Sequence, residues 1–208
     1  MSVDTSVVKN VPDNAYEANI LCHNCDNVIL SQFEDYASKF LYGGLGRKDR
    51  VTITPFQLYH EVKNINYHKL KLFVLSLLWK CSISKTFAEV NLSLEQEEEI
   101  RLILMENKFI SENHFPVSIL SYAHLKEVPN EIIFSPYISK KEKGEQNFLF
   151  FGGGLLFQII VEYQQISPIN LESMLKESGE IKLIQVPSES MKSLINNYVG
   201  WDFLKSTP

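Results

Sequence analysis

Two cysteines near the start of the chain carry the clearest chemical signal in the sequence. Cys22 and Cys25 lie in residues 20–27, ILCHNCDN, and two thiolates at this spacing bind one zinc ion from the same side when the segment forms a tight knuckle. Because tetrahedral zinc needs four ligands, this pair predicts half of a zinc site. The other residues of ligand type are scattered and form no second pair with matching spacing: His23, His60, His68, Cys81, His114 and His124.

The cysteine pair is open to other interpretations. In one alternative, Cys22 and Cys25 are simply small, reduced side chains that pack in the structure without a metal ion. A thioredoxin-type redox role requires the first thiol at the start of a helix in a βαβ setting. That role is disfavoured here, because Asp26 and Asn27 follow the pair and the helix is expected to begin only at Ser31. Zinc coordination and simple packing both stay open.

A basic loop is the second chemical signal. Residues 43–46 (GGLG) are followed by Arg47, Lys48 and Arg50, and cationic side chains on such a loop can contact the phosphate backbone of a nucleic acid. The competing interpretation is a solvated loop after a helix cap, since the whole chain has a net charge of −5.

Three helices are predicted in the first half of the chain. A capping box of Ser31 and Glu34 opens the first, which ends at the following glycine pair. Residues 67–82 are apolar nearly all round and therefore predict a buried central helix. A second capping box, at Ser93 and Gln96, opens a helix that runs to about residue 107.

Short β-branched and aromatic segments dominate the second half. Three glycines at 152–154 predict a hairpin turn and not a phosphate-binding loop, because Leu155 and Leu156 follow where such a loop needs Lys and Ser or Thr. A short helix is predicted near residues 171–177 and a final helix at about 189–198. Extended segments are predicted at residues 51–61, where Pro55 indicates an edge strand, and at 117–122, 131–138, 146–151, 155–163 and 181–186.

The order of these elements predicts the α+β class, with an N-terminal CxxC knuckle and helices followed by a mostly antiparallel sheet. We expect residues 1–208 to form a single domain, with a helical part at about 20–110 and a sheet-rich part at about 115–208. The 208 residues are 45% hydrophobic and 22% charged, which excludes a disordered chain, a coiled coil and a collagen.

Composition and charge also constrain location and partners. Three cysteines predict no disulfide framework, the first residues contain no apolar leader, and the apolar windows are too short to span a bilayer. We therefore expect a cytoplasmic protein with no membrane contact. A protein partner or a homodimer is open, and so is contact with nucleic acid through Arg47, Lys48 and Arg50.

The segment around the cysteines resembles a known family. CHNCDN at residues 22–27 and SQFEDYASKF at 31–40 are similar to a stretch of bacterial HNH-endonuclease-like proteins in which Leu-Cys-x-x-Cys, an acidic residue and Asn precede Glu-x-Tyr. KLFVLSLLWK at residues 71–80 resembles the buried helix of that group. The similarity covers about residues 16–105.

The resemblance implies a zinc site that an upstream cysteine pair completes, together with a histidine that activates water in a ββα-metal nuclease. No Cys or His precedes Cys22, and Asp26 stands where the wider superfamily often carries His, although a carboxylate there could bind a hard cation such as Mg²⁺. We therefore expect an HNH-nuclease-related protein, associated with defence or mobile elements, with an incomplete zinc knuckle and no catalysis by this chain alone. The second hypothesis is a non-enzymatic protein-interaction module with structural cysteines.

Overall fold

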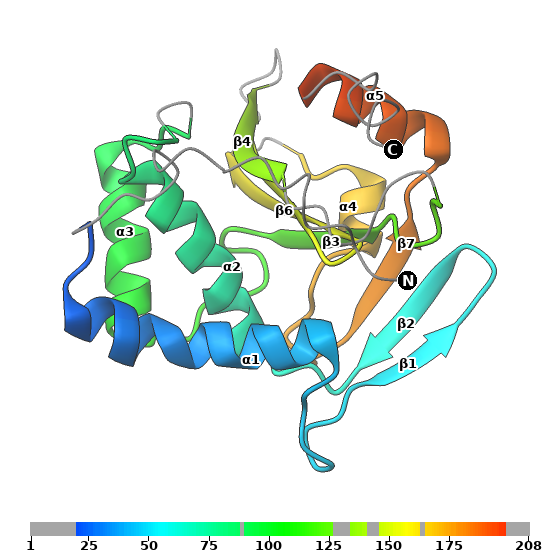
Figure 1. Ribbon diagram of the computed structural model, residues 1–208, viewed down its shortest axis with the longest axis horizontal. Coiled ribbons are helices and arrows are strands. Elements are labelled where there is room, and N and C mark those ends of the chain that lie inside the picture. The colour runs from blue at the N-terminus through cyan, green and yellow to red at the C-terminus, as the bar shows by residue number, and fades with distance from the viewer. Residues whose placement is uncertain (1–19, 88–89, 127–133, 141–145, 163–164, 199–208) are drawn as a thin grey trace, which may run out of the picture.

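A seven-stranded sheet separates two groups of helices in the part of the chain that the computed structural model describes, residues 20–87, 90–126, 134–140, 146–162 and 165–198 (Figure 1). The helices are the π-helical η3 (Cys25–Leu30), α1 (Ser31–Tyr42), α2 (Tyr67–Ser82), α3 (Leu94–Met105), α4 (Pro168–Glu172) and α5 (Ser188–Tyr198). The strands are β1 (Thr52–Pro55), β2 (Tyr59–Lys63), β3 (Val117–Ser121), β4 (Phe134–Lys140), β5 (Gln146–Gly152), β6 (Leu155–Glu162) and β7 (Ile181–Gln185).

The sheet has the order β1-β2-β7-β3-β6-β5-β4. Neighbouring strands are antiparallel except for β3 and β7, which run parallel. The prediction of an α+β fold with a mostly antiparallel sheet is therefore confirmed. Strands β1 and β2 come from the first half of the sequence, and the pairing of β2 with β7 joins them to strands of the second half.

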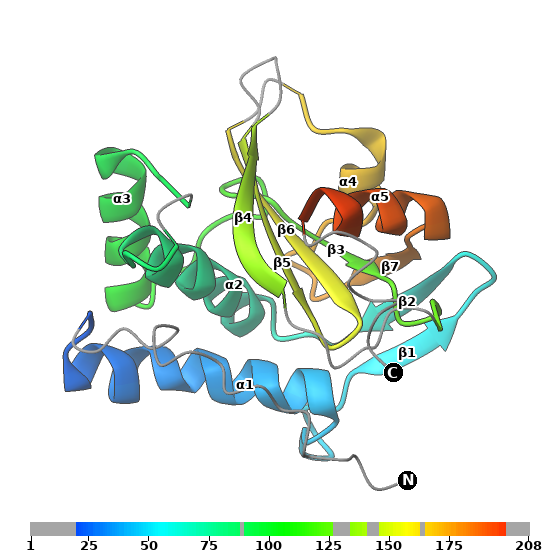
Figure 2. The same cartoon turned by 45° about the horizontal axis from the view of Figure 1, so that its top comes forward.

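One face of the sheet packs against α1, α2 and α3. Successive side chains of a strand point to opposite faces, and the set that faces these helices is fully buried and strongly apolar. Figures 1 and 2 show the three helices together on one side of the strands. The strand residues at this interface are Val117, Ile119, Phe148, Phe157 and Ile159.

The opposite face of the sheet is covered by α5. Met191 of α5 is fully buried, and Leu194 packs beside it. Strand residues complete this second cluster: Leu120, Leu149 and Leu156. Each of them is adjacent in sequence to a residue that faces the first group of helices, so its side chain points to the opposite face. The molecule therefore has three layers, and residues of β3, β5 and β6 contribute to both interfaces.

Helix α2 has the bounds that its apolar run predicts. Its N-cap is Asn66, whose side chain accepts a hydrogen bond from the amide of Lys69 at 3.0 Å. The backbone amide of the same residue, Asn66, donates a hydrogen bond to the hydroxyl of Tyr36 in α1 at 2.7 Å. A single loop residue thus joins the start of α2 to the buried face of α1.

Most of the other predicted elements are confirmed. Ser93 and Gln96 form both hydrogen bonds of a capping box at α3, and Gly153 and Gly154 form the turn between β5 and β6. The short helix predicted near residues 171–177 lies earlier, as α4 at Pro168–Glu172, because Ser167 caps it and proline is favoured in a first helical turn. The first three residues of the predicted strand 131–138 lie outside the described residues.

None of the helices in the described residues combines the length and the apolar character that crossing a bilayer demands.

Gly179 provides a sharp test of the packing between the loop before β7 and the loop after β2. Its φ is +74°, and a Cβ atom there would lie 2.4 Å from the carbonyl oxygen of Ile65, whose amide donates to the Gly179 carbonyl at 3.0 Å. We expect Gly179→Ala to lower the free energy of unfolding by about 3 kcal/mol, measured by urea denaturation.

Gly46→Ala is the matched control for this substitution. Gly46 has no left-handed φ, and the nearest atom to an added Cβ is 3.8 Å away, so a change within about 0.5 kcal/mol is expected. Equal effects of the two substitutions would contradict the close approach of the two loops.

Candidate thiol site

Cys22 immediately precedes a long helix, and Cys25 lies in the first turn of that helix. Helical structure begins at His23, passes through η3 and continues into α1 without a break. The amide of Asp26 already donates to the carbonyl of Cys22 at 3.0 Å. The prediction that the helix starts only at Ser31, after a separate knuckle, is therefore wrong.

The physical reason lies in the surroundings of Ser31. Its hydroxyl donates to the carbonyl of Asn27 at 2.8 Å, a bond made from within a helix to the preceding turn, instead of capping the free amides of a first turn. Glu34 forms an ion pair with Lys80 of α2 and is not a partner of Ser31. The C-terminal prediction is confirmed, since Gly43 has a left-handed φ of +77° and ends α1.

The cysteine sulfur atoms are close to each other and to the solvent. Their Sγ atoms lie 3.1 Å apart, and the amide of Cys25 donates to the Sγ of Cys22 at 3.3 Å. Cys22 is exposed, whereas Cys25 is half-buried. The structure therefore brings the predicted pair together and makes its two members inequivalent.

The hydrogen bonds separate the acidities of the two thiols. The pKa of Cys22 is lowered, chiefly because the thiol of Cys25 and then its amide stabilise the Cys22 thiolate. The pKa of Cys25 is raised, mainly by that same hydrogen bond and secondly by its partial burial. Cys22 is therefore the first of the two to ionise, and at that point Cys25 is the donor across the 3.1 Å contact.

The other residues of ligand type do not join the pair within the described residues, where no group of three or more His, Cys, Asp or Glu side chains could hold a metal ion. His23 bonds to Asn27 at 3.0 Å. His68 bonds to Asn107, and His114 pairs with Glu99 on α3 at 3.0 Å.

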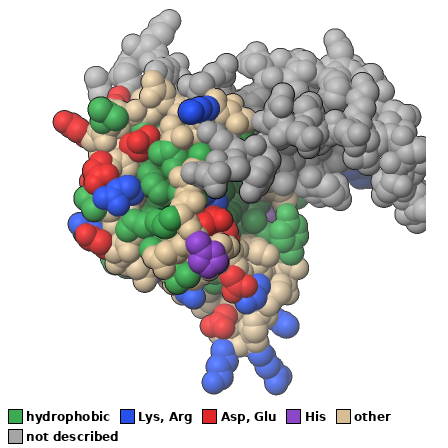
Figure 3. All heavy atoms as spheres, turned by 60° about the vertical axis from the view of Figure 1, so that its left-hand side comes forward, with side chains coloured by type: hydrophobic (Ala, Val, Ile, Leu, Met, Phe, Trp, Pro, Cys, Tyr) green, Lys and Arg blue, Asp and Glu red, His purple; other side chains and the backbone are tan. Residues whose placement is uncertain are grey.

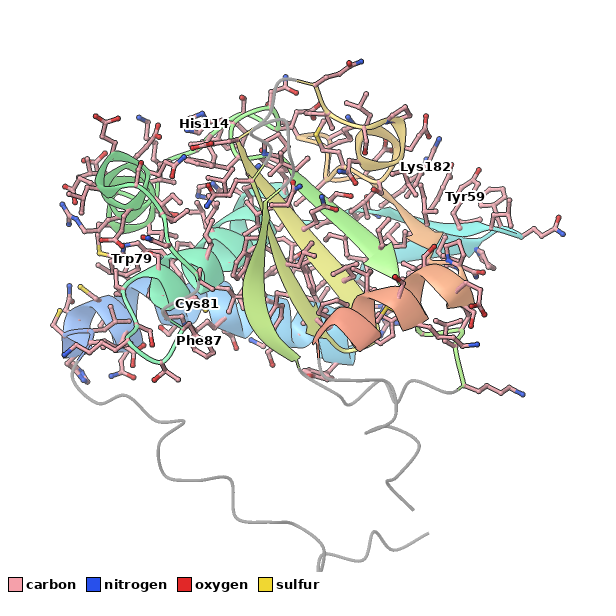
Figure 4. The ribbon with its side chains drawn as sticks, turned by 90° about the horizontal axis from the view of Figure 1, so that it is seen from above. Tyr59, Trp79, Cys81, Phe87, His114 and Lys182 are labelled. Carbon is pink, nitrogen blue, oxygen red and sulfur yellow. The ribbon has the colours of Figure 1, made fainter. Side chains whose placement is uncertain are left out.

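Cys81 is separate from the pair as well. It is buried on α2, and burial raises the pKa of its thiol to about 12. Figure 4 shows it beside Trp79 and Phe87, far from His114 at another edge of the molecule. A packing role thus fits Cys81, as a lone thiol after an apolar run suggests.

The basic residues of the loop between α1 and β1 are exposed, as the solvated-loop and phosphate-contact interpretations both require. Arg47, Lys48 and Arg50 all lie on this loop. Lys48 also lines a cavity of about 470 Å³ together with Lys39 and Lys69. Figure 3 shows lysine and arginine side chains projecting from the lower end of one face.

Lys71 is a charged residue that sequence reasoning placed in the core helix without a separate role. Its side chain is 1% exposed, and its Nζ donates to the carbonyl of Phe115 at 2.6 Å. Burial lowers the pKa of Lys71 to about 7, although the nearby carboxylates of Glu112 and Glu177 oppose this shift. A lysine inside an apolar run was the available sequence signal for this unusual environment.

Comparisons with known proteins add no family to this description. No protein-family model, no curated protein and no solved structure matched the chain. The side chains themselves are therefore the only indication of function.

Lys71 predicts a specific pH dependence of stability. Because the folded pKa of about 7 is below the ordinary value of 10.5, the unfolded chain binds one more proton between these two pH values. Lys71 therefore makes the free energy of unfolding rise with pH in this window, by up to about 1.4 kcal/mol per pH unit. We expect Lys71→Met to remove this rise in urea denaturation series from pH 7 to 10.

Lys69→Met serves as the control, since it removes a half-buried lysine from the same helix. It should leave the pH dependence of unfolding close to that of the unmodified chain. The same slope in Lys71→Met and in the unmodified protein would contradict the assignment to Lys71.

Proposed function

We propose that Cys22 and Cys25 supply two of the four ligands of a zinc site in an HNH-nuclease-related protein. The other two ligands come from a second protein molecule, either another copy or a partner, that docks at the start of the long helix. The observation that carries this proposal is the 3.1 Å separation of two exposed or half-buried sulfur atoms on one helical turn.

The geometry of the pair is compatible with zinc after a small adjustment. Zinc–sulfur bonds of about 2.3 Å at a tetrahedral angle place two sulfur atoms about 3.8 Å apart. Side-chain rotation about the Cα–Cβ bonds covers the difference from 3.1 Å. The lowered pKa of Cys22 also favours binding, because zinc takes the thiolate form.

The proposal gives this chain a scaffold role and no catalytic residue. Hydrolysis at a ββα-metal centre needs a metal ion for the leaving oxygen and a base for water. Asp26, the acidic residue beside the pair, is exposed on the same helix, and no cluster of three ligand-type residues accompanies it within the described part of the chain.

Zinc content is the direct test. We expect protein purified without chelator to hold about half a zinc ion per chain if two copies share one ion, and about one per chain in a complex with a separate partner. Cys22→Ser and Cys25→Ser should each abolish the bound zinc, because the remaining thiolate cannot hold the ion alone. Metal analysis together with the mass of the assembly in solution distinguishes the two cases.

Cys81→Ser is the matched control, since it removes a cysteine that lies outside the pair. It should keep the zinc content of the unmodified chain. Zinc-free protein whose Cys22→Ser variant folds and assembles normally would contradict the proposal and leave a protein-interaction module with structural cysteines.

The basic loop favours nucleic acid as a further binding partner of this scaffold. Arg47, Lys48 and Arg50 lie exposed on this loop, on a chain whose net charge is −5. The cavity that Lys48 lines is bordered by Lys39 and Lys69 and also by Asp35 and Asp49, and Asp35 forms an ion pair with Lys39. The local excess of positive charge on the loop suits contacts with phosphate groups, which fix position without reading sequence.

Salt dependence tests this second function. If Arg47, Lys48 and Arg50 each neutralise a phosphate, their combined replacement by Gln should weaken binding to duplex DNA and reduce the slope of log K against log salt by about 2 to 3. The control is the combined replacement of Lys108, Lys126 and Lys192 by Gln, which removes the same charge elsewhere. An equal loss in both triple variants would contradict a site at the loop.

A further inference from the structure

The sulfur pair has a second chemical capability that does not depend on a metal ion. The two Sγ atoms are 3.1 Å apart, and a disulfide bond has a length of about 2.05 Å. Cys22 lies just before the start of the helix, and Cys25 lies in its first turn. Closing the remaining gap of about 1 Å requires side-chain rotation and no change of fold.

The surroundings of Cys22 favour negative charge on its sulfur. The amide of Cys25 points at this sulfur, with a nitrogen–sulfur distance of 3.3 Å. The helix that begins at His23 and runs on to Tyr42 presents its N-terminal end here, and a helix N-terminus stabilises nearby anions. A sulfur held in this way is a good nucleophile and also a good leaving group.

Unequal exposure assigns different roles to the two thiols. Cys22 is open to solvent and can be reached by another molecule, whereas Cys25 is half-buried behind it. We propose that Cys22 and Cys25 form a redox-active dithiol that reduces a disulfide bond in another molecule, with Cys22 as the attacking thiol and Cys25 as the resolving thiol.

The reaction balances without a cofactor. The Cys22 thiolate attacks one sulfur of the substrate disulfide, so that a mixed disulfide forms and the other substrate sulfur leaves as a thiolate. Cys25, after losing its proton to water, attacks the Sγ of Cys22 and releases the second substrate thiolate. The substrate disulfide is reduced to two thiols, and the dithiol of this chain is oxidised to one disulfide.

This inference goes beyond the proposed zinc site and uses the same two sulfur atoms. A zinc ion would block the exchange by occupying both thiolates, so the two capabilities are tested separately. Zinc content is measured on protein purified without chelator, and the exchange is measured on the full-length chain after chelator treatment. A negative result for zinc binding does not exclude disulfide exchange, and a negative result for disulfide exchange does not exclude zinc binding.

The experiment uses glutathione disulfide as the oxidant and intact-protein mass spectrometry as the readout. The unmodified chain should lose two hydrogen atoms and keep no glutathione, with the new bond mapped to Cys22 and Cys25. Cys25→Ser should trap one glutathione on Cys22, because the resolving thiol is absent. Cys22→Ser should form glutathione adducts at least about tenfold more slowly than Cys25→Ser does.

Two controls keep the outcome decisive. Cys81→Ser should behave as the unmodified chain, because the buried Cys81 thiol is not part of the pair. Circular dichroism of every variant establishes that the helices are retained. A stable glutathione adduct on the unmodified chain, a bond that includes Cys81, or faster reaction at Cys25 than at Cys22 would overturn the proposal.

Insulin, whose two chains are joined by disulfide bonds, serves as a protein substrate, and release of its separated chains is the readout. Release of the insulin chains together with slow oxidation of this chain by glutathione disulfide assigns a protein substrate. Fast oxidation by glutathione disulfide without release of the insulin chains assigns a small disulfide. No oxidation by either reagent overturns the redox role.

Discussion

Burial of α2 is the constraint on which the other elements depend. This helix is apolar on almost every side, with Leu70, Leu75 and Leu78 fully buried, so it needs partners all round and not on one stripe. The sheet covers one side, and α1 and α3 cover the others. Lys71 is tolerated in this setting because its amine finds the carbonyl of Phe115, which limits the penalty of burying a polar group.

The packing of α1 on α2 also determines where the thiols lie. In an uninterrupted α-helix Cys22 would share the face of Phe33, since eleven residues make about three turns, and Phe33 is fully buried. The π-helical turn η3 lies between them, and its wider hydrogen-bonding pattern changes the rotation per residue. Cys22 is exposed, and the helix still buries Leu30.

Local signals in the sequence were sufficient for much of the fold. The capping box at Ser93 satisfies free amides within four residues, and the three glycines before Leu155 permit a tight turn; neither depends on distant contacts. The start of the first helix was different, because Ser31 carries a capping pattern that tertiary packing overrides. The pairing of β2 with β7 joins residues more than a hundred positions apart, which no short pattern encodes.

For the site, spacing predicted that the two sulfur atoms would meet, but the unequal acidity of Cys22 and Cys25 depends on the unforeseen helix start.

Metal binding and disulfide exchange place opposite demands on the surroundings of two sulfur atoms. A structural zinc site is closed by four ligands and excludes other reactants, whereas exchange requires one sulfur that a substrate can approach in line with its own disulfide. The exposed start of the long helix satisfies the second demand in the single chain, and it satisfies the first only when another molecule covers the thiols. Docking at this surface would therefore convert the pair from a reactive dithiol into a stable joint between two proteins. If both proposals hold, the chemistry of Cys22 and Cys25 at this one helix start depends on whether a partner is bound.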